Sequence, residues 1–180
     1  MYRILKKETL APVSKLYVIE APEVARKAKA GQFIILRANE RGERVPLTIA
    51  DYDRDAGTIT IVVQEVGKSS MLLGTMNEGD CLASFTGPLG QPTEIENYGT
   101  VLLVGGGFAI APVYPIARAL KAAGNSVLSI IGVRSKDLLF WEDKVRSVSD
   151  ELVVCTDDGT YGRKGVVTAD EGDAGNKTAH

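Results

Sequence analysis

The sequence predicts an antiparallel β-barrel followed by an incomplete parallel α/β domain, because the hydrophobic pattern changes its period near Thr100. Before that point, short runs rich in Val, Ile, Phe and Tyr are separated by Gly or Asp turns, as in the strands of a small barrel. These runs cover residues 13–20, 32–37, 58–65 and 80–85, and a short helix is expected from Ser69 to Gly74. After Thr100, strands and helices alternate, which is typical of parallel βαβ units.

The α/β part is expected to contain few strands. The pattern indicates strands at residues 101–104, 126–133 and 151–156 and helices at 111–123 and 138–148. This is little for a self-sufficient doubly wound sheet, so we expect an incomplete domain. The last residues carry no large apolar side chain and cannot contribute to a core. The expected organisation is therefore a barrel over 1–96, an α/β domain over 97–168 and a disordered tail over 169–180.

Charge and hydropathy exclude several classes of partner. The net charge of -2 at pH 7 gives no electrostatic basis for binding nucleic acid or an anionic membrane. No apolar run approaches the ~20 residues that a membrane-spanning helix needs. The first residues lack the apolar stretch of a signal peptide, so we expect a cytoplasmic protein with no membrane partner.

The few cysteines and the single histidine argue against metal and triad chemistry. Cys81 and Cys155 both lie inside apolar stretches and are expected to be buried structural thiols. His180 is the last residue, so it supports neither a catalytic triad nor a histidine metal site. We expect no metal site, and Trp141, at helical spacing from its apolar neighbours, is expected in the core.

A glycine-rich turn joins the first α/β strand to its helix. Gly105, Gly106 and Gly107 follow a buried strand, and Pro112 falls in the first turn of the next helix. Glycines let the backbone approach a phosphate, and a helix N-terminus attracts an anion. A glycine turn can also be purely structural. The spacing differs from the G-x-G-x-x-G of ordinary Rossmann dehydrogenases.

Two segments of the barrel half complete a pattern. The first is Arg44-Val45-Pro46-Leu47-Thr48-Ile49, and the second is Val66-Gly67-Lys68-Ser69-Ser70 before an apolar helix. With the exit loop Gly87-Pro88-Leu89-Gly90 and the glycine turn, they occur in the order found in the ferredoxin–NADP reductase superfamily. The chain resembles that superfamily over residues 1 to about 168. Within it, the Pro-Leu-Thr strand is most similar to the small electron-transfer subunit of ferredoxin:NADP oxidoreductases, and dihydroorotate dehydrogenase electron-transfer subunits are near relatives.

The resemblance implies an FAD-binding β-barrel followed by a Rossmann-like nucleotide-binding domain. Arg44, Pro46, Leu47, Thr48 and Ile49 would lie along FAD, with Thr48 as the catalytic residue near flavin N5. The phosphate-binding turn would be formed by Val66, Gly67, Lys68, Ser69 and Ser70. The alternatives are a Thr at a barrel rim and a plain helix cap beside an exposed lysine.

The resemblance also implies a site for NAD(H) or NADP(H). Its residues would be Gly105, Gly106, Gly107, Pro112, Arg134, Asp157 and Gly159. Arg134 could instead be a solvated charge, and Asp157-Asp158-Gly159 an acidic turn. The residues do not decide between the two nucleotides. The implied function is hydride transfer from NAD(P)H to FAD, with electrons passing to iron–sulfur partners.

The sequence departs from the family pattern at two places. If Thr48 takes the family's Ser position, Val45 takes the Arg position, and a one-residue shift turns Arg44 to the opposite strand face unless a bulge intervenes. The ligands for the family's 2Fe–2S cluster and its later nicotinamide loop are absent from this sequence, which looks C-terminally truncated. The expected partner is a larger iron–sulfur flavoprotein subunit in a heterodimer, with ferredoxin indirectly. The alternatives are a dihydroorotate dehydrogenase subunit and a non-catalytic binding module.

Overall fold

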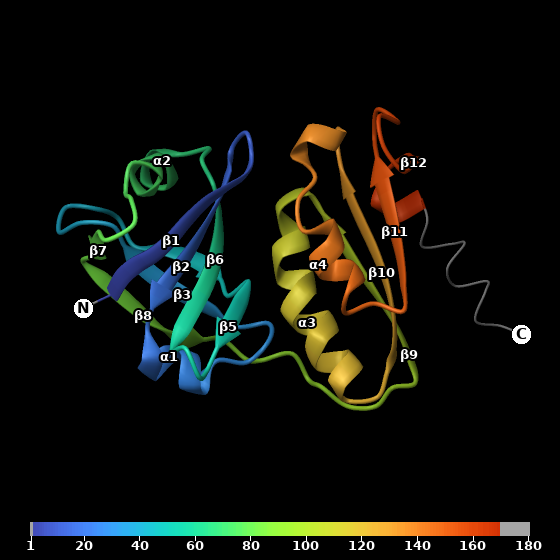
Figure 1. Ribbon diagram of the computed structural model, residues 1–180, viewed down its shortest axis with the longest axis horizontal. Helices are drawn as coiled ribbons and strands as arrows, with labels where there is room; N and C mark the ends of the chain where they lie inside the picture. The colour runs from blue at the N-terminus through green and yellow to red at the C-terminus, as the bar shows by residue number, and fades with distance from the viewer. Residues whose placement is uncertain (1, 170–180) are drawn as a thin grey trace, which may run out of the picture. The chain divides into compact units, whose positions relative to one another are not determined.

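The computed structural model describes residues 2–169, which form two compact units divided between Thr93 and Glu94 (Figure 1). Apart from Ala169, the predicted tail lies outside the described residues. Each unit is described by itself below.

The first unit consists of two antiparallel sheets. Their strand orders are β5-β6-β2-β1-β7 and β4-β3-β8. The strands are β1 (Tyr2–Ala11), β2 (Ser14–Glu20), β3 (Phe33–Arg37), β4 (Val45–Thr48), β5 (Asp51–Asp53), β6 (Thr58–Gln64), β7 (Cys81–Leu82) and β8 (Ser84–Leu89), with helices α1 (Pro22–Lys27) and α2 (Lys68–Gly74). The predicted antiparallel barrel is confirmed.

One hydrophobic core joins the two sheets. Ile4 and Ile19 come from one sheet, Ile34 and Leu36 from the other, and all four are fully buried. β2 and β6 pair without interruption from Ser14–Gln64 to Glu20–Thr58, which explains the continuous apolar run in β6. Alternate β6 side chains enter the core, and this burial orders the strands around it.

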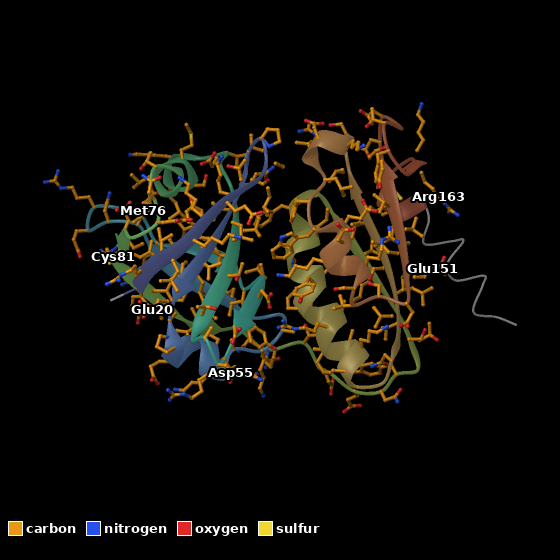
Figure 2. The ribbon with its side chains drawn as sticks, viewed as in Figure 1. Glu20, Asp55, Met76, Cys81, Glu151 and Arg163 are labelled. Atoms are coloured by element: carbon orange, nitrogen blue, oxygen red, sulfur yellow. The ribbon has the colours of Figure 1, made fainter. Side chains whose placement is uncertain are left out.

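Cys81 corrects one expectation, because its thiol is exposed. β7 is a two-residue strand at the edge of its sheet, and its alternation buries Leu82 while turning Cys81 outward (Figure 2). Apolar neighbours in the sequence therefore did not determine burial. Cys155, in the second unit, is buried as expected.

The second unit is a parallel sheet with the order β12-β11-β10-β9. The elements are β9 (Thr100–Gly106), η1 (Gly107–Ala109), α3 (Ile110–Ala122), β10 (Ser126–Val133), η2 (Lys136–Leu138), α4 (Glu142–Arg146), β11 (Glu151–Thr156), β12 (Arg163–Lys164) and η3 (Val167–Ala169). The parallel α/β prediction is confirmed. The two-residue strand β12 was not predicted, because so short a segment has no periodicity.

Helices α3 and α4 lie on the same face of this sheet (Figure 1). The α3 side chains Ala117 and Leu120 pack with Val127 of β10. The opposite face carries η3, whose Val167 side chain lies against Gly106 and Gly132. On that same face, by strand alternation, Leu102 remains 39% exposed.

The helix predicted at 138–148 is shorter than expected. A 3₁₀ turn ends at Leu138, Leu139 is extended, and α4 spans only Glu142–Arg146. Trp141 precedes α4 with φ 59, a left-handed conformation that interrupts the helix. The Trp141 side chain is half-buried and stands edge-on to the rings of Tyr114 and Phe140, so tertiary contacts replaced the local helical pattern.

Gly105 sets the distance between β9 and α3. A Cβ at this position would lie 2.7 Å from Cγ2 of Val113 and 3.0 Å from the carbonyl oxygen of Ala109. At Gly106 the nearest atom is Cγ2 of Val167, at an ordinary 3.6 Å. Only the first of these glycines is required by helix packing.

We therefore expect Gly105→Ala to lower the free energy of unfolding by about 1–3 kcal/mol, since the added methyl overpacks the interface between helix and strand. Gly106→Ala is the matched control and should change it little. Chemical denaturation of both variants measures the difference. Equal stability of the two variants would contradict this account of the turn.

Candidate functional site

The outer face of the sheet β4-β3-β8 carries the predicted flavin strand. β4 pairs with β3 so that Thr48 is opposite Phe33 and Pro46 is opposite Ile35. Pro46 is exposed and Thr48 is half-buried, while Val45 and Leu47 pack against the barrel core. The structure thus divides the predicted residues between two faces of one strand.

The position of Arg44 follows from the same alternation. Within the paired residues 33–36 and 45–48 the register is unbroken, so no bulge brings Arg44 to the place of Val45. Val45 points to the core, and Arg44, one residue earlier, is exposed on the side of Pro46 and Thr48. The family's arginine position is therefore held by a core residue.

Ile49 is placed differently from its neighbours in the motif. Its side chain is fully buried in the core, and its N–H donates to the Gln32 carbonyl oxygen at 3.0 Å. Neither its side chain nor its N–H is therefore available to a ligand.

The α2 turn collects the second predicted motif. The Ser70 hydroxyl accepts hydrogen bonds from the N–H groups of Gly67, at 3.0 Å, and Val66, at 3.2 Å, and so caps the helix itself. The Ser69 hydroxyl donates to the Glu43 carboxylate, which joins the turn to the segment that carries Arg44. The Lys68 side chain is exposed. The first hydrogen bond inside the helix is donated by the Met71 N–H to the Gly67 carbonyl oxygen. The N–H groups of residues 68–70, in the first turn, therefore have no partner within the helix.

Two side chains fasten the other end of α2 to the barrel. The Tyr17 hydroxyl donates to the Leu73 carbonyl oxygen at 2.9 Å, and Lys7 Nζ donates to the carbonyls of Gly74 and Met76, each at 2.7 Å. Burial, with the nearby negative charge of Glu65 adding to it, raises the pKa of Tyr17 to about 12. The helix C-terminal carbonyls, which have no partners within α2, are satisfied by these donors.

The glycine turn of the second unit leaves space above its backbone. Gly107 has φ +56, and no atom lies within 4 Å of a Cβ built there. Gly106 is paired with Gly132 of β10, so two strand ends meet at this edge without side chains. Pro112 lies in the first turn of α3, as the sequence predicted. The open backbone fits the close approach of a phosphate.

A pocket of about 520 Å³ lies at the carboxyl ends of β10 and β11. It is lined by Arg134, Ser135, Leu138, Asp157 and Asp158. The structure thus brings two predicted residues, Arg134 and Asp157, together with Ser135 and Asp158 beside them, and it adds Leu138, which sequence reasoning missed. The N–H groups of Asp157 and Asp158 donate to the carbonyls of Val133 and Arg134, at 3.1 and 3.2 Å, which holds the two strand ends side by side.

The two carboxylates of this pocket differ in their surroundings. The hydroxyl and N–H of Thr160 both donate to Asp158, and these hydrogen bonds lower its pKa. Asp157 is exposed, and no residue of the described chain bonds to its side chain. Gly159 has φ +77, which the tight turn after the strand requires.

A second pocket, of about 470 Å³, was not expected from the sequence. Trp141, Phe140 and Tyr161 contribute aromatic surface to it, together with Lys136 and Lys144. The left-handed Trp141 turns a residue predicted for the core into part of this wall. No sequence signal marks that change, because it depends on one backbone angle.

Relatives and solved structures agree with this architecture. No family model matches the chain. It is 49% identical over 165 residues, 92% of its length, to the dihydroorotate dehydrogenase B (NAD(+)) electron transfer subunit homolog of Thermotoga maritima, and 48% identical over 175 residues to an uncharacterized protein of Clostridium beijerinckii. It matches an NADH-dependent reduced ferredoxin-NADP oxidoreductase, studied for electron bifurcation, with 46% identity and a TM-score of 0.89 over 98% of its length. The chain belongs to the ferredoxin–NADP reductase superfamily.

The chain matches only part of each of these longer proteins. The chain spans 58% of the length of both relatives and 62% of the solved chain. Phthalate dioxygenase reductase, at 21% identity and a TM-score of 0.72, shows the fold alone. The resemblance drawn from the motifs is confirmed, but the names of the curated relatives favour the alternative reading, a dihydroorotate dehydrogenase subunit, over the ferredoxin:NADP reading.

Membership in this superfamily implies a fold of the kind that binds FAD and NAD(P)H. Two of the relatives are named as electron transfer subunits. Within residues 2–169, no helix is long and apolar enough to cross a membrane. In the same range, no group of three or more His, Cys, Asp or Glu side chains is placed to hold a metal ion.

The Tyr17 hydrogen bond gives a test of how α2 is held. Tyr17→Phe removes one of two donors to the Leu73 carbonyl, which still accepts from the Met76 N–H at 3.0 Å. We therefore expect a loss of about 0.5–1.5 kcal/mol in the free energy of unfolding at pH 7. The pKa of Tyr17 in the folded protein lies above its ordinary value of 10.0, so the contribution to stability is complete below pH 10 and is lost as the pH rises toward 12. Denaturation at several pH values measures both effects. A variant with the same alkaline slope as the wild type would contradict the assignment.

Proposed function

We propose that the chain is the FAD- and NAD-binding part of an electron-transfer subunit of the dihydroorotate dehydrogenase B type. The observation that carries this proposal is the 49% identity to the Thermotoga maritima relative over 92% of the chain. A Bacillus cereus electron transfer subunit of the same name supports it, with 34% identity over 84% of the chain.

The barrel offers surfaces that fit FAD. Pro46 and Thr48 present an accessible strand face, and Thr48 would donate a hydrogen bond to the flavin edge from its half-buried hydroxyl. Lys68 and the free N–H groups of the α2 turn would hold phosphate. In the described structure Leu47 and Ile49 face the core, so they would hold the β4 segment in place beneath the flavin ring.

When bound, FAD supplies the exchange between two-electron hydride chemistry and single-electron transfer. The chain's residues then have to bind, orient and exclude water, because hydride transfer needs no proton relay. The lack of a need for a proton relay agrees with the described residues, among which neither Thr48 nor Arg134 is part of a nucleophile–base pair. Positioning is the contribution expected of the protein.

The pocket at the ends of β10 and β11 favours NADH. A carboxylate in this place accepts hydrogen bonds from ribose hydroxyls and repels a 2′-phosphate. Asp157 is exposed in the pocket, and the lowered pKa of Asp158 keeps that carboxylate charged near neutral pH. Among the described residues, Arg134 is the single cation that lines this pocket. The glycine turn 105–107, which is open at Gly107, would receive the pyrophosphate of the nicotinamide dinucleotide.

A second candidate function is the small subunit of an NADH-dependent ferredoxin-NADP oxidoreductase. The 46% identity and TM-score of 0.89 over 98% of the chain support it. Both candidates assign the same work to this chain and differ in the partner. For the second, the partner would be a larger iron–sulfur flavoprotein subunit.

Asp157→Ser tests nucleotide selectivity. Removing the carboxylate should raise the affinity for NADPH and lower that for NADH, shifting the ratio of the two dissociation constants about tenfold, which corresponds to ~1.4 kcal/mol. Titration of each nucleotide against the purified protein measures the shift, and Asp55→Asn in the first unit is the matched control. Selectivity that stays unchanged in Asp157→Ser would contradict the role of Asp157.

The proposed function is tested by adding FAD to the purified chain and recording its visible spectrum. We expect bound flavin that NADH bleaches in the absence of oxygen. Bound flavin that stays oxidised after NADH is added would support the FAD site in the barrel and reject the nicotinamide site. A folded chain that takes up no FAD would reject the proposal.

The partner is identified by co-purification of the tagged protein from its own cells. Recovery with a dihydroorotate-oxidising flavoprotein, and NAD+ reduction that depends on dihydroorotate, would support the first candidate. Recovery with a larger iron–sulfur flavoprotein that reduces ferredoxin would support the second and reject the first.

A further inference from the structure

Arg37 holds a buried polar atom that no residue of the described chain satisfies. It is the last residue of β3, and its side chain is 29% exposed. One guanidinium nitrogen, Nη2, donates to Glu40 at 2.9 Å, but Nε is buried and has no hydrogen-bond partner within residues 2–169. An unsatisfied buried donor destabilises the fold, so it indicates a group that binds there.

The strand geometry brings a second arginine beside it. The β3–β4 pairing ends at Leu36 and Val45; Arg37 is the residue after Leu36, and Arg44 is the residue before Val45, just outside β4. Each is adjacent in sequence to a residue that faces the core, Leu36 for Arg37 and Val45 for Arg44, so alternation directs both toward the outer face. Like charges in directly opposite positions repel each other. An anion bound between them would remove that repulsion and satisfy the Arg37 donor.

The neighbouring rows of this face describe the rest of the ligand. Thr48 is opposite Phe33, and Phe33 is paired with Leu89 of β8, so this end of the face is apolar with one hydroxyl. Arg37 lies four residues along β3, about 13 Å away at the rise of an extended strand. The face thus suits a molecule with a flat aromatic ring at one end and an anionic group at the other.

The α2 turn lies on the same side as the arginine end. The Ser69 hydroxyl bonds to Glu43, the residue before Arg44, so the turn and the arginine segment are in contact. Lys68 adds a third cation, and it is exposed at the start of the helix. Glu40, 82% exposed, supplies the only charge that the structure pairs with Arg37 within the described chain.

We propose that Arg37, together with Arg44, binds the diphosphate of FAD on the outer face of β3. Arg37 would thus replace the arginine that the family has at position 45. This inference rests on the proposed function. A guanidinium matches the geometry of phosphate oxygens, and its charge-assisted hydrogen bonds are stronger than neutral ones. Arg37 is thus a binding residue that does not belong to the motif 44–49.

The experiment compares Arg37→Met with the matched control Arg41→Met. Arg41 is an exposed arginine in the loop that follows β3. Affinities are measured by fluorescence titration for FAD, for riboflavin, which lacks phosphate, and for ADP, which carries a diphosphate without the flavin ring. We expect Arg37→Met to weaken FAD and ADP about tenfold or more and to leave riboflavin unchanged. Arg41→Met should leave all three unchanged.

Thermal unfolding of the flavin-free proteins separates binding from structure. Because Arg37→Met removes an unsatisfied buried donor, its melting temperature without FAD should equal or exceed that of the wild type. Arg37→Lys keeps the charge without the Nε donor and should bind FAD with intermediate affinity, which covers the case of a Met variant that fails to fold.

Three results would overturn the inference in distinguishable ways. Wild-type FAD affinity in Arg37→Met rejects the role of Arg37 and leaves the proposed function intact. Equal losses for FAD and riboflavin, with a lower melting temperature without FAD, show a structural role only. A wild-type chain that binds neither FAD nor ADP rejects the proposed function, and this inference with it.

Discussion

The two-residue alternation of β3 is the constraint on which the barrel site depends. Ile34 and Leu36 are fully buried, so Phe33, Ile35 and Arg37 must face the other way. The unbroken register with β4 carries the same alternation into Pro46 and Thr48. A slip by one residue would bring Arg37 into the core and Leu36 to the surface, which the free energy of burial forbids.

Backbone segments at both candidate nucleotide sites are held by buried packing behind them. Tyr17 and Lys7 fasten the C-terminal end of α2, which leaves the N–H groups at its other end free to meet an anion. Gly105 lets α3 approach β9 closely, which fixes the open turn at Gly107. The charges of the two sites then differ. Near the barrel turn the exposed cations Arg44 and Lys68 accompany Arg37, with Glu40 and Glu43 bonded to Arg37 and Ser69, whereas Asp157 and Asp158 line the β10–β11 pocket with Arg134. This contrast suits a diphosphate at the first site and an unphosphorylated ribose at the second.

Much of the fold and part of the site follow from the sequence. The change of hydrophobic period near Thr100 predicted an antiparallel barrel and a parallel α/β part, because strand and helix periods differ and each must bury one face. The glycine turn predicted the junction of β9 and α3, with Pro112 in the first turn of that helix. The family resemblance implied that Arg134 and Asp157 belong to one nucleotide site, and the structure places both in the lining of one pocket.

By itself, the sequence determined the two-part architecture, several of its strands and helices, and the superfamily, since these depend on local pattern. Only the tertiary structure decided which way individual side chains face. It exposed Cys81 on a sheet edge, buried Ile49, and turned Trp141 into a pocket wall through one left-handed residue. It also placed Arg37 and Arg44 next to the last residues of the β3–β4 pairing, Leu36 and Val45, although a loop separates the two arginines in the sequence. Cross-strand neighbours are set by register, and register is fixed by burial of the whole core rather than by any one segment.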